Sequence, residues 1–159
     1  MLSHSKLFFS VLITFITFII DQVSKNYVEK NIDFFVSGQN VFDGLNLVYV
    51  QNKGVSFGLL SELNITFLLG IISLIVSGYI IFLIYKSQRT TELVALSMIL
   101  GGALGNGVDR INNLYVIDFI DIYYKGFHWP AFNFADSFIT VGALIFFLLC
   151  FVKKIIKII

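Results

Sequence analysis

The sequence has few of the residues that build disulfides, metal centres or nucleophilic triads. Cys150 is the only cysteine, so no intrachain disulfide can form, and its place in an apolar run suggests a packing or lipid-facing sulfur. The only histidines are His4 and His128, with no His-x-x-x-His spacing and no paired glutamate. Zinc hydrolysis and a serine mechanism therefore lack their usual residues, and we expect neither a metal nor a cofactor.

Charged residues are also scarce. They make up 13% of the chain and hydrophobic residues 57%, whereas about a quarter of a soluble domain is charged. This composition predicts an integral membrane protein. The net charge is only +1, and no basic run stands beside aromatic residues, so a nucleic-acid partner has no support.

Four apolar runs predict four transmembrane helices in one membrane domain, residues 1–159. Crossing the hydrocarbon takes about 17 to 25 residues, so three of the runs need their flanks. The runs are Leu7 to Ile20, Ile65 to Tyr85, Leu93 to Val108 and Ser137 to Val152. The predicted spans are about 7–26, 65–85, 92–109 and 137–153, with external segments 29–64 and 110–136 between them.

The first run has a basic start, as a cleaved signal peptide has, but no small-x-small cleavage site follows Ile20. Polar residues recur at intervals of three and four and form one stripe on a helix that continues to about Val28: Ser10, Thr14, Thr17, Asp21 and Ser24 or Lys25. We expect a retained helix whose stripe faces the other helices. For the two threonines, hydrogen bonds to their own helix backbone explain the pattern equally well.

Basic residues predict the topology. Six of the eleven fall in the short segments that four spans place on one side: Lys6, Lys86, Arg89, Lys153, Lys154 and Lys157. The positive-inside rule therefore predicts that both termini are cytoplasmic. On the other side, alternation over Leu45 to Val50 with turns at Gly44 and Gly54 predicts a strand in a small antiparallel sheet.

Two carboxylates, Asp109 and Asp136, stand where apolar runs meet the external segments. Carboxylates at membrane edges are costly, so a functional role is the first hypothesis. Asp109 shares a helix stripe with Gly102, Asn106 and Asn113 that should face inward, because lipid cannot satisfy it.

Each residue also has a simpler explanation. A lone Asp136 is better explained as a helix N-cap. Asp21 and Lys25 form an ordinary i, i+4 pair, and Arg110 either neutralises Asp109 or snorkels to headgroups. Gly101-x-x-x-Gly105 by itself indicates close helix packing.

The shared position of several polar residues favours a functional site over these simpler explanations. Six polar residues meet at the external boundary under one topology: Asp21, Asn52, Asp109, Arg110, Asn133 and Asp136. Two carboxylates about 4 Å apart repel by roughly 4 kcal/mol, or about three pKa units, so one holds a proton while the other stays charged. Such a pair can activate water and protonate a leaving group. The Gly-x-Gly-Asp motif of presenilin-like proteases is absent, since Val108 separates Gly107 from Asp109.

The chain resembles lipoprotein signal peptidase, also called signal peptidase II, over nearly its whole length. The matching motifs, in order, are Asp21-Gln22-x-x-Lys25, Asn52-x-Gly54-x-Ser56-Phe57, Gly101-Gly102-Ala103-x-Gly105-Asn106-x-x-Asp109-Arg110, Val116-x-Asp118-Phe119 and Phe132-Asn133-x-Ala135-Asp136. The resemblance implies an all-α membrane protein of four transmembrane helices, with a small external β cradle and a short interfacial helix.

The resemblance also implies roles. Asp109 and Asp136 would be the catalytic dyad, Asn52, Gly54, Asn106, Arg110 and Asn133 would line the pocket, and Asp21 and Lys25 would support the site or substrate. The substrate would be a prolipoprotein carrying a diacylglyceryl-modified cysteine just after the scissile bond. We expect a monomer in the bacterial inner membrane, among its lipids, with an external active site that binds lipopeptides of the globomycin type.

Some points stay open. Gly107 stands where a bulkier apolar residue is expected and predicts a looser helix end. Asp118 belongs to a matching motif and Asp121 does not, so Asp118 ranks higher for substrate contact, with an ion-pair or turn role as its alternative. A non-enzymatic proton or ion carrier is the competing function, although a carrier needs a polar stripe across the whole bilayer. A binding or scaffold protein descended from the family is a third possibility.

Overall fold

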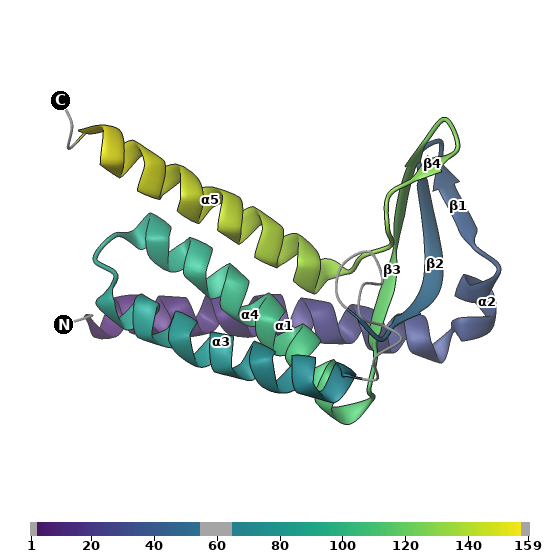
Figure 1. The fold of residues 1–159 in the computed structure, drawn as a ribbon, viewed down its shortest axis with the longest axis horizontal. Helices are drawn as coiled ribbons and strands as arrows, with labels where there is room; N and C mark the ends of the chain where they lie inside the picture. Colours follow the sequence, from purple (N-terminus) through teal and green to yellow (C-terminus); the bar gives the residue numbers. More distant parts are fainter. Residues whose placement is uncertain (1–2, 55–64, 157–159) are drawn as a thin grey trace.

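The computed structural model describes residues 3–54 and 65–156, so Ser56 and Phe57 of the second motif lie outside the described residues. Its four long helices are α1 (His4–Lys30), α3 (Thr66–Lys86), α4 (Thr90–Asn112) and α5 (Phe134–Ile156). All four are long and apolar enough to cross a membrane. A small antiparallel sheet lies at one end of the bundle and both chain termini at the other (Figure 1). The predicted fold class is confirmed.

The polar stripe of α1 faces the other helices, as predicted. Its buried members are Ser10, Thr17, Asp21 and Lys25. The Ser10 hydroxyl lies 2.6 Å from the Ser97 hydroxyl of α4, and Thr14 donates to the Ser97 carbonyl at 3.3 Å. Only Thr17 bonds its own helix, donating to the Ile13 carbonyl at 2.9 Å. The stripe is therefore the surface on which α1 packs.

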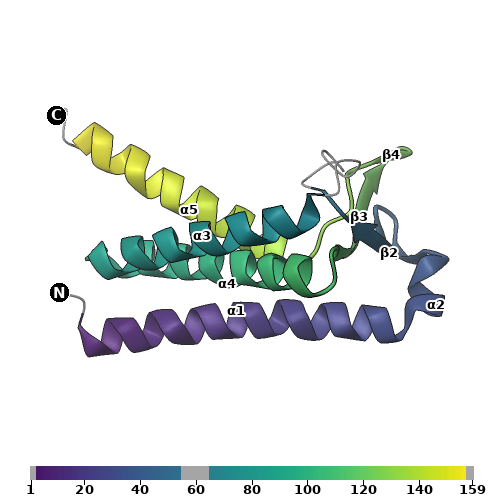
Figure 2. The same ribbon diagram turned by 60° about the horizontal axis from the view of Figure 1, so that its bottom comes forward.

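Helix α4 lies between the others and is the most buried of the four, contacting α1, α3 and α5 (Figures 1 and 2). Small residues make this possible. A Cβ on Gly101 would overlap the Thr17 hydroxyl of α1, and one on Gly102 would overlap the Ala135 carbonyl of α5. The close packing predicted for Gly101 and Gly105 is present, since a Cβ on Gly105 would overlap the Asp21 carboxylate of α1, and Gly102 extends it to α5.

Gly107 has a packing role too. An added Cβ would lie 3.2 Å from both the Cβ and the Oγ of Ser73 on α3. Helix α4 continues through Gly107 to Asn112. The glycine accommodates α3, and the looser helix end that we expected does not occur.

The sheet has the order β1-β2-β3-β4. Its strands are β1 (Gln39–Phe42), β2 (Leu45–Asn52), β3 (Val116–Tyr124) and β4 (Phe127–His128). The strand β2 was predicted, but its partner β1 was not named, and Gly44 at the turn between them has a φ of +102°, which suits glycine. The long strand β3 was not predicted. Its first four residues are all buried, so the apolar-polar alternation that marks a strand is missing there.

An apolar cluster holds the sheet against the end of α1. It consists of Val28, Phe35, Ile117 and Phe119, with Leu47, Tyr49, Tyr115 and Ile120 packed against it. Phe35 belongs to the short helix α2 (Ile32–Val36), which follows α1 directly (Figure 2). This cluster fixes β3 above the end of the bundle, next to the start of α5.

Candidate active site

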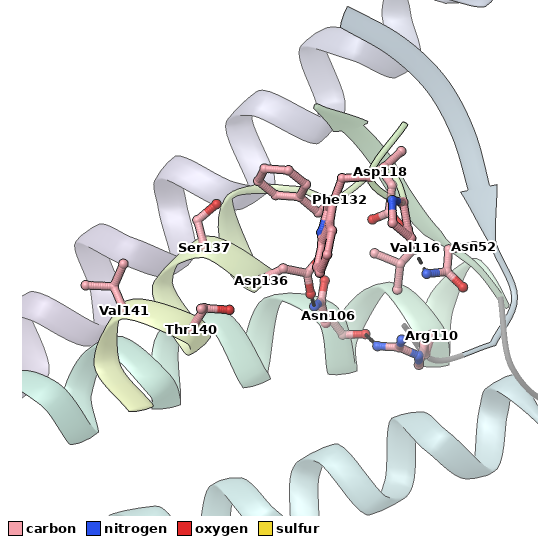
Figure 3. Close-up of a pocket in the computed structure, with 13 residues that line it drawn as sticks. Asn52, Asn106, Arg110, Val116, Asp118, Phe132, Asp136, Ser137, Thr140 and Val141 are labelled. Carbon is pink, nitrogen blue, oxygen red and sulfur yellow. Dashed lines mark hydrogen bonds between the residues drawn. The ribbon is translucent and has the colours of Figure 1, made fainter. Parts of the chain in front are cut away.

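A cavity of about 560 Å³ opens where the ends of α4 and β2 meet β3 and the start of α5. Its polar wall comes from four elements, with Asn52 from β2, Asn106 and Arg110 from α4, Asp118 from β3 and Asp136 from α5 (Figure 3). Apolar residues complete it, among them Val116, Phe132 and, one turn along α5 from Ser137, Val141. The cavity therefore combines two carboxylates with hydrogen-bond donors and an apolar rim.

Asp136 is held by the first turn of α5. Its backbone N–H donates to the Asn133 Oδ1 at 2.9 Å, and its Oδ2 accepts the Asn133 backbone N–H at 3.2 Å. This reciprocal arrangement is a capping box, in which Asn133 caps the helix and Asp136 bonds back to it. The alternative explanation of Asp136 as the N-cap is therefore corrected, because the cap is Asn133.

Asp136 also reaches α4. Its Oδ1 accepts a hydrogen bond from the Asn106 Nδ2 at 2.8 Å. Both oxygens of the carboxylate thus accept hydrogen bonds, and the residue still lines the cavity.

Asp118 is 2% exposed, and two amides donate to its carboxylate. The Asn52 Nδ2 lies 2.9 Å from Oδ2, and the Asn133 Nδ2 lies 2.6 Å from Oδ1. Burial raises the pKa of Asp118 to about 7, with a further contribution from the negative charge of Asp136. The two amides oppose this shift. At neutral pH, Asp118 is thus a carboxyl that can hold or release a proton.

Asp109 has different surroundings. Its Oδ2 forms an ion pair with the Lys25 Nζ at 2.7 Å, and its Oδ1 accepts from Gln22 at 3.0 Å. The same ammonium binds Asp21 at 2.7 Å. Asp109 is not among the residues that line the cavity. The three charged groups form a second cluster, and Asn106 connects it to the cavity through a 2.8 Å bond from Lys25.

Arg110 lines the cavity, as the resemblance implies. Its guanidinium donates to two backbone carbonyls, those of Gly54 at 3.0 Å and Asn106 at 3.2 Å. The Gly54 N–H in turn donates to the Asn52 Oδ1 at 3.0 Å. Among the side chains described, the Arg110 Nε is a buried donor with no hydrogen-bond partner. Arg110 thus links the residue after β2 to α4 by hydrogen bonds, while its buried Nε has no hydrogen-bond partner among the described residues.

The higher rank of Asp118 over Asp121 agrees with these positions. Asp121 lies farther along β3, where it accepts from Asn46 at 2.9 Å and pairs with His128 at 2.9 Å.

Over residues 3–54 and 65–156, no group of three or more metal-ligating side chains is present.

The structure gathers the predicted site residues into two groups. Asn52, Asn106, Arg110 and Asp136 line the cavity, with Gly54 and Asn133 bonded to its wall, whereas Asp21, Lys25 and Asp109 form the neighbouring charged cluster. The sequence hypothesis gave Asp118 no catalytic role. Its signal was an acid between buried apolar residues, in Val116-Ile117-Asp118-Phe119.

Comparisons with known proteins agree on one family. The family model described as "Signal peptidase (SPase) II" matches residues 13–152. The lipoprotein signal peptidase of Thermodesulfovibrio yellowstonii is 40% identical over 144 residues, which cover 89% of this chain and 93% of that protein. The Polynucleobacter necessarius protein of the same name is 41% identical over 134 residues, 82% of each chain. A solved bacterial membrane enzyme matches with a TM-score of 0.80 at 30% identity, covering 91% of this chain and 88% of its own.

Proposed function

This multi-pass bacterial membrane protein belongs to the signal peptidase II family, the proteases that remove signal peptides from prolipoproteins, and we propose that it cleaves by an aspartic mechanism with Asp118 and Asp136 activating water. One observation carries the proposal. Two carboxylates from different elements line a single cavity, and the charge of one raises the pKa of the other.

The sequence analysis favoured Asp109 as the second carboxyl of the catalytic pair. Asp118 is the better partner for Asp136 in that pair. The Asp109 carboxylate shares the Lys25 ammonium with Asp21 and is not among the residues that line the cavity. A carboxylate with a permanent cation beside it is a poor general acid, because the cation favours the charged form. Asp118 has amides for partners and a pKa of about 7, which suits proton transfer near neutral pH.

The reaction follows from two carboxyl groups in opposite protonation states. Charged Asp136 takes a proton from water as the water oxygen bonds to the scissile carbonyl carbon. Protonated Asp118 donates to the carbonyl oxygen, which gives a gem-diol. When the C–N bond breaks, Asp136 passes the proton that it took from water to the departing amine, and Asp118 takes back a proton from the diol hydroxyl. The Asn106 donor to Asp136 favours its charged form.

The substrate we propose is a prolipoprotein with a diacylglyceryl-modified cysteine, cleaved just before that cysteine. The cavity supports this choice because its wall continues from Asp136 along α5 through Ser137, Thr140 and Val141, inside a membrane-spanning helix. A lipid-anchored chain diffusing in the bilayer would meet the carboxylates at this depth. By the same argument, lipopeptides of the globomycin type should occupy the cavity and inhibit.

The orientation we propose places both termini in the cytoplasm and the cavity at the external face of the inner membrane. Both termini lie at the end of the bundle away from the sheet (Figure 1). The connection between α3 and α4, at that same end, carries Lys86 and Arg89, and Lys6 donates to its Gln88 carbonyl at 2.5 Å. Basic residues gathered on short segments indicate the cytoplasmic side.

The test is cleavage of a diacylglyceryl-modified prolipoprotein by the purified protein, followed on a gel. Asp118→Asn and Asp136→Asn should each slow cleavage by about 10²- to 10⁴-fold, the usual contribution of general acid–base catalysis. Neither variant should lower the unfolding temperature in detergent by more than a few degrees.

Asp109→Asn decides between the two candidate partners of Asp136. It should retain more activity than Asp118→Asn, because it leaves the cavity wall unchanged. Full activity in Asp118→Asn, with loss in Asp109→Asn, would restore the pairing of Asp109 with Asp136. Substrate retention without cleavage by the wild type would instead indicate a binding protein.

A further inference from the structure

Lys25 is buried in α1 at 3% exposure, and its ammonium has three oxygen partners. Asp21 and Asp109 each lie 2.7 Å from Nζ, and the Asn106 Oδ1 lies 2.8 Å away. An ammonium carries three protons and no lone pair, so these bonds use its whole donor capacity. Lys25 is thus held in one geometry.

This geometry fixes the orientation of the Asn106 amide. The atom that faces Lys25 must be an acceptor, so it is the oxygen Oδ1. The Asn133 Nδ2 approaches the same oxygen at 3.3 Å, which is consistent with that assignment. The Nδ2 of Asn106 must then point the other way, and there it donates to Asp136 at 2.8 Å.

A second connection runs from the same cluster to α5. The Asp21 Oδ1 accepts the backbone N–H of Ala135 at 2.9 Å, while its Oδ2 binds Lys25. Ala135 is the residue immediately before Asp136 and is fully buried. The cluster thus positions both the side chain that donates to Asp136 and the backbone that carries it.

We propose that Lys25 is a positioning residue for the reaction, which acts by orienting the Asn106 amide so that Nδ2 donates to the Asp136 carboxylate. The inference rests on the proposed function, since it assumes that Asp136 is the base. Without Lys25, the Asn106 amide is free to turn its oxygen toward Asp136, and the donor that favours the charged carboxylate is lost.

Two double variants separate orientation from charge. The cluster of Asp21, Asp109 and Lys25 carries a net charge of −1, from two carboxylates and one ammonium. Lys25→Gln with Asp109→Asn, and Lys25→Met with Asp109→Asn, both keep that formal charge, because each double variant removes one ammonium and one carboxylate. Gln and Met are similar in size, but only Gln has an N–H group that can donate to the Asn106 Oδ1.

If orientation is the role of Lys25, kcat in the Met variant should be about 10- to 100-fold below that of the Gln variant, the usual effect of losing one hydrogen bond to a charged group. KM should differ much less. The acid side of the pH-rate profile should also lie about one pH unit higher in the Met variant, as the base then protonates more readily. A residue with only a structural role would not move this profile.

Asn106→Asp gives a second test that keeps all three oxygen partners of Lys25. It should reproduce the low kcat and the shifted profile, because no N–H group then faces Asp136. This variant decides the question if the Met double variant does not fold.

The outcomes separate the two proposals. If the wild type cleaves but the two double variants share one kcat and one profile, the role of Lys25 is overturned and the proposed function stands. Wild-type kinetics in Asn106→Asp would overturn it as well. A wild type that does not cleave the lipid-modified substrate overturns both.

Discussion

Asp109 and Asp118 have the same side chain and are buried to a similar degree, 6% and 2% exposed, yet their surroundings give them different chemistry. Asp109 forms an ion pair with the Lys25 ammonium, which also binds Asp21. Asp118 faces two neutral amides and lies near a second carboxylate, which leaves it able to exchange a proton near pH 7. At the scale of single residues, function depends on which group lies beside the carboxyl.

The raised pKa of Asp118 predicts a pH-dependent stability. A folded pKa of about 7 against an ordinary value of 3.8 means that the native protein binds more protons than the unfolded chain between these values. The free energy of unfolding therefore falls as pH rises through this window. Asp118→Asn removes the buried charge, so its melting temperature in detergent should exceed that of the wild type at pH 8 and approach it at pH 4.

The control is Asp121→Asn on the same strand, which breaks the pair with His128. It should show no gain in melting temperature at pH 8. Equal pH dependence in the wild type and Asp118→Asn would contradict the assignment of a raised pKa to Asp118.

At the scale of elements, α4 organises the molecule because its glycines let three helices approach it. Gly101 accommodates α1, Gly102 accommodates α5 and Gly107 accommodates α3. Gly105 has a further role, because a Cβ there would overlap the Asp21 carboxylate. The helix that supplies Asn106 and Arg110 to the cavity is thus also the helix that fixes the position of its neighbours.

Gly105→Ala should destabilise the protein by about 1 to 3 kcal/mol, the usual range for overpacking a buried contact. It should also lower cleavage, since it displaces Asp21 from Lys25 and Ala135. The matched control is Gly78→Ala on α3, where an added Cβ meets nothing within 4 Å. Alanine has the higher helix propensity, so Gly78→Ala should be neutral or stabilising by up to about 1 kcal/mol. Thermal unfolding of both variants in detergent, beside the cleavage assay, tests this contrast.

At the scale of the whole molecule, the cavity and the short basic α3–α4 connection lie at opposite ends of the helix bundle. The sheet is at one end of the four helices, and both termini with the α3–α4 connection are at the other (Figure 1). The residues that line the cavity come from β2, β3 and the adjoining parts of α4 and α5. The apolar side chains on the outer faces of α1, α3 and α5 are widely exposed, as expected for helices that contact lipid. This polarity supports a single orientation in the membrane.

The orientation can be measured with single cysteines in a Cys150→Ala background. Lys125→Cys, in the exposed turn between β3 and β4, should react with a membrane-impermeant maleimide in intact spheroplasts. Gln88→Cys, in the exposed α3–α4 connection, should react only after the membrane is permeabilised. The reverse pattern would place the cavity on the cytoplasmic side.

The sequence alone determined the features that depend on local composition and spacing. Apolar runs long enough for hydrocarbon defined four membrane helices, and a three-four polar spacing identified the buried face of α1. Gly44 and the alternation after it predicted the strand β2 and the turn before it. The ordered motifs identified the family. Each of these signals consists of residues that are close together in the sequence, so it could be recognised without the tertiary structure.

Only the tertiary structure decided which carboxylates meet. Asp109 and Asp136 look equivalent in sequence because both stand at the boundary of an apolar run. In the fold, however, Lys25 on another helix forms an ion pair with Asp109. Asp118 reaches the cavity through the pairing of β3 with β2, a long-range register that an apolar strand without alternation does not reveal. The approach of side chains from four elements depends on how these elements pack, and this is why the site needed the fold.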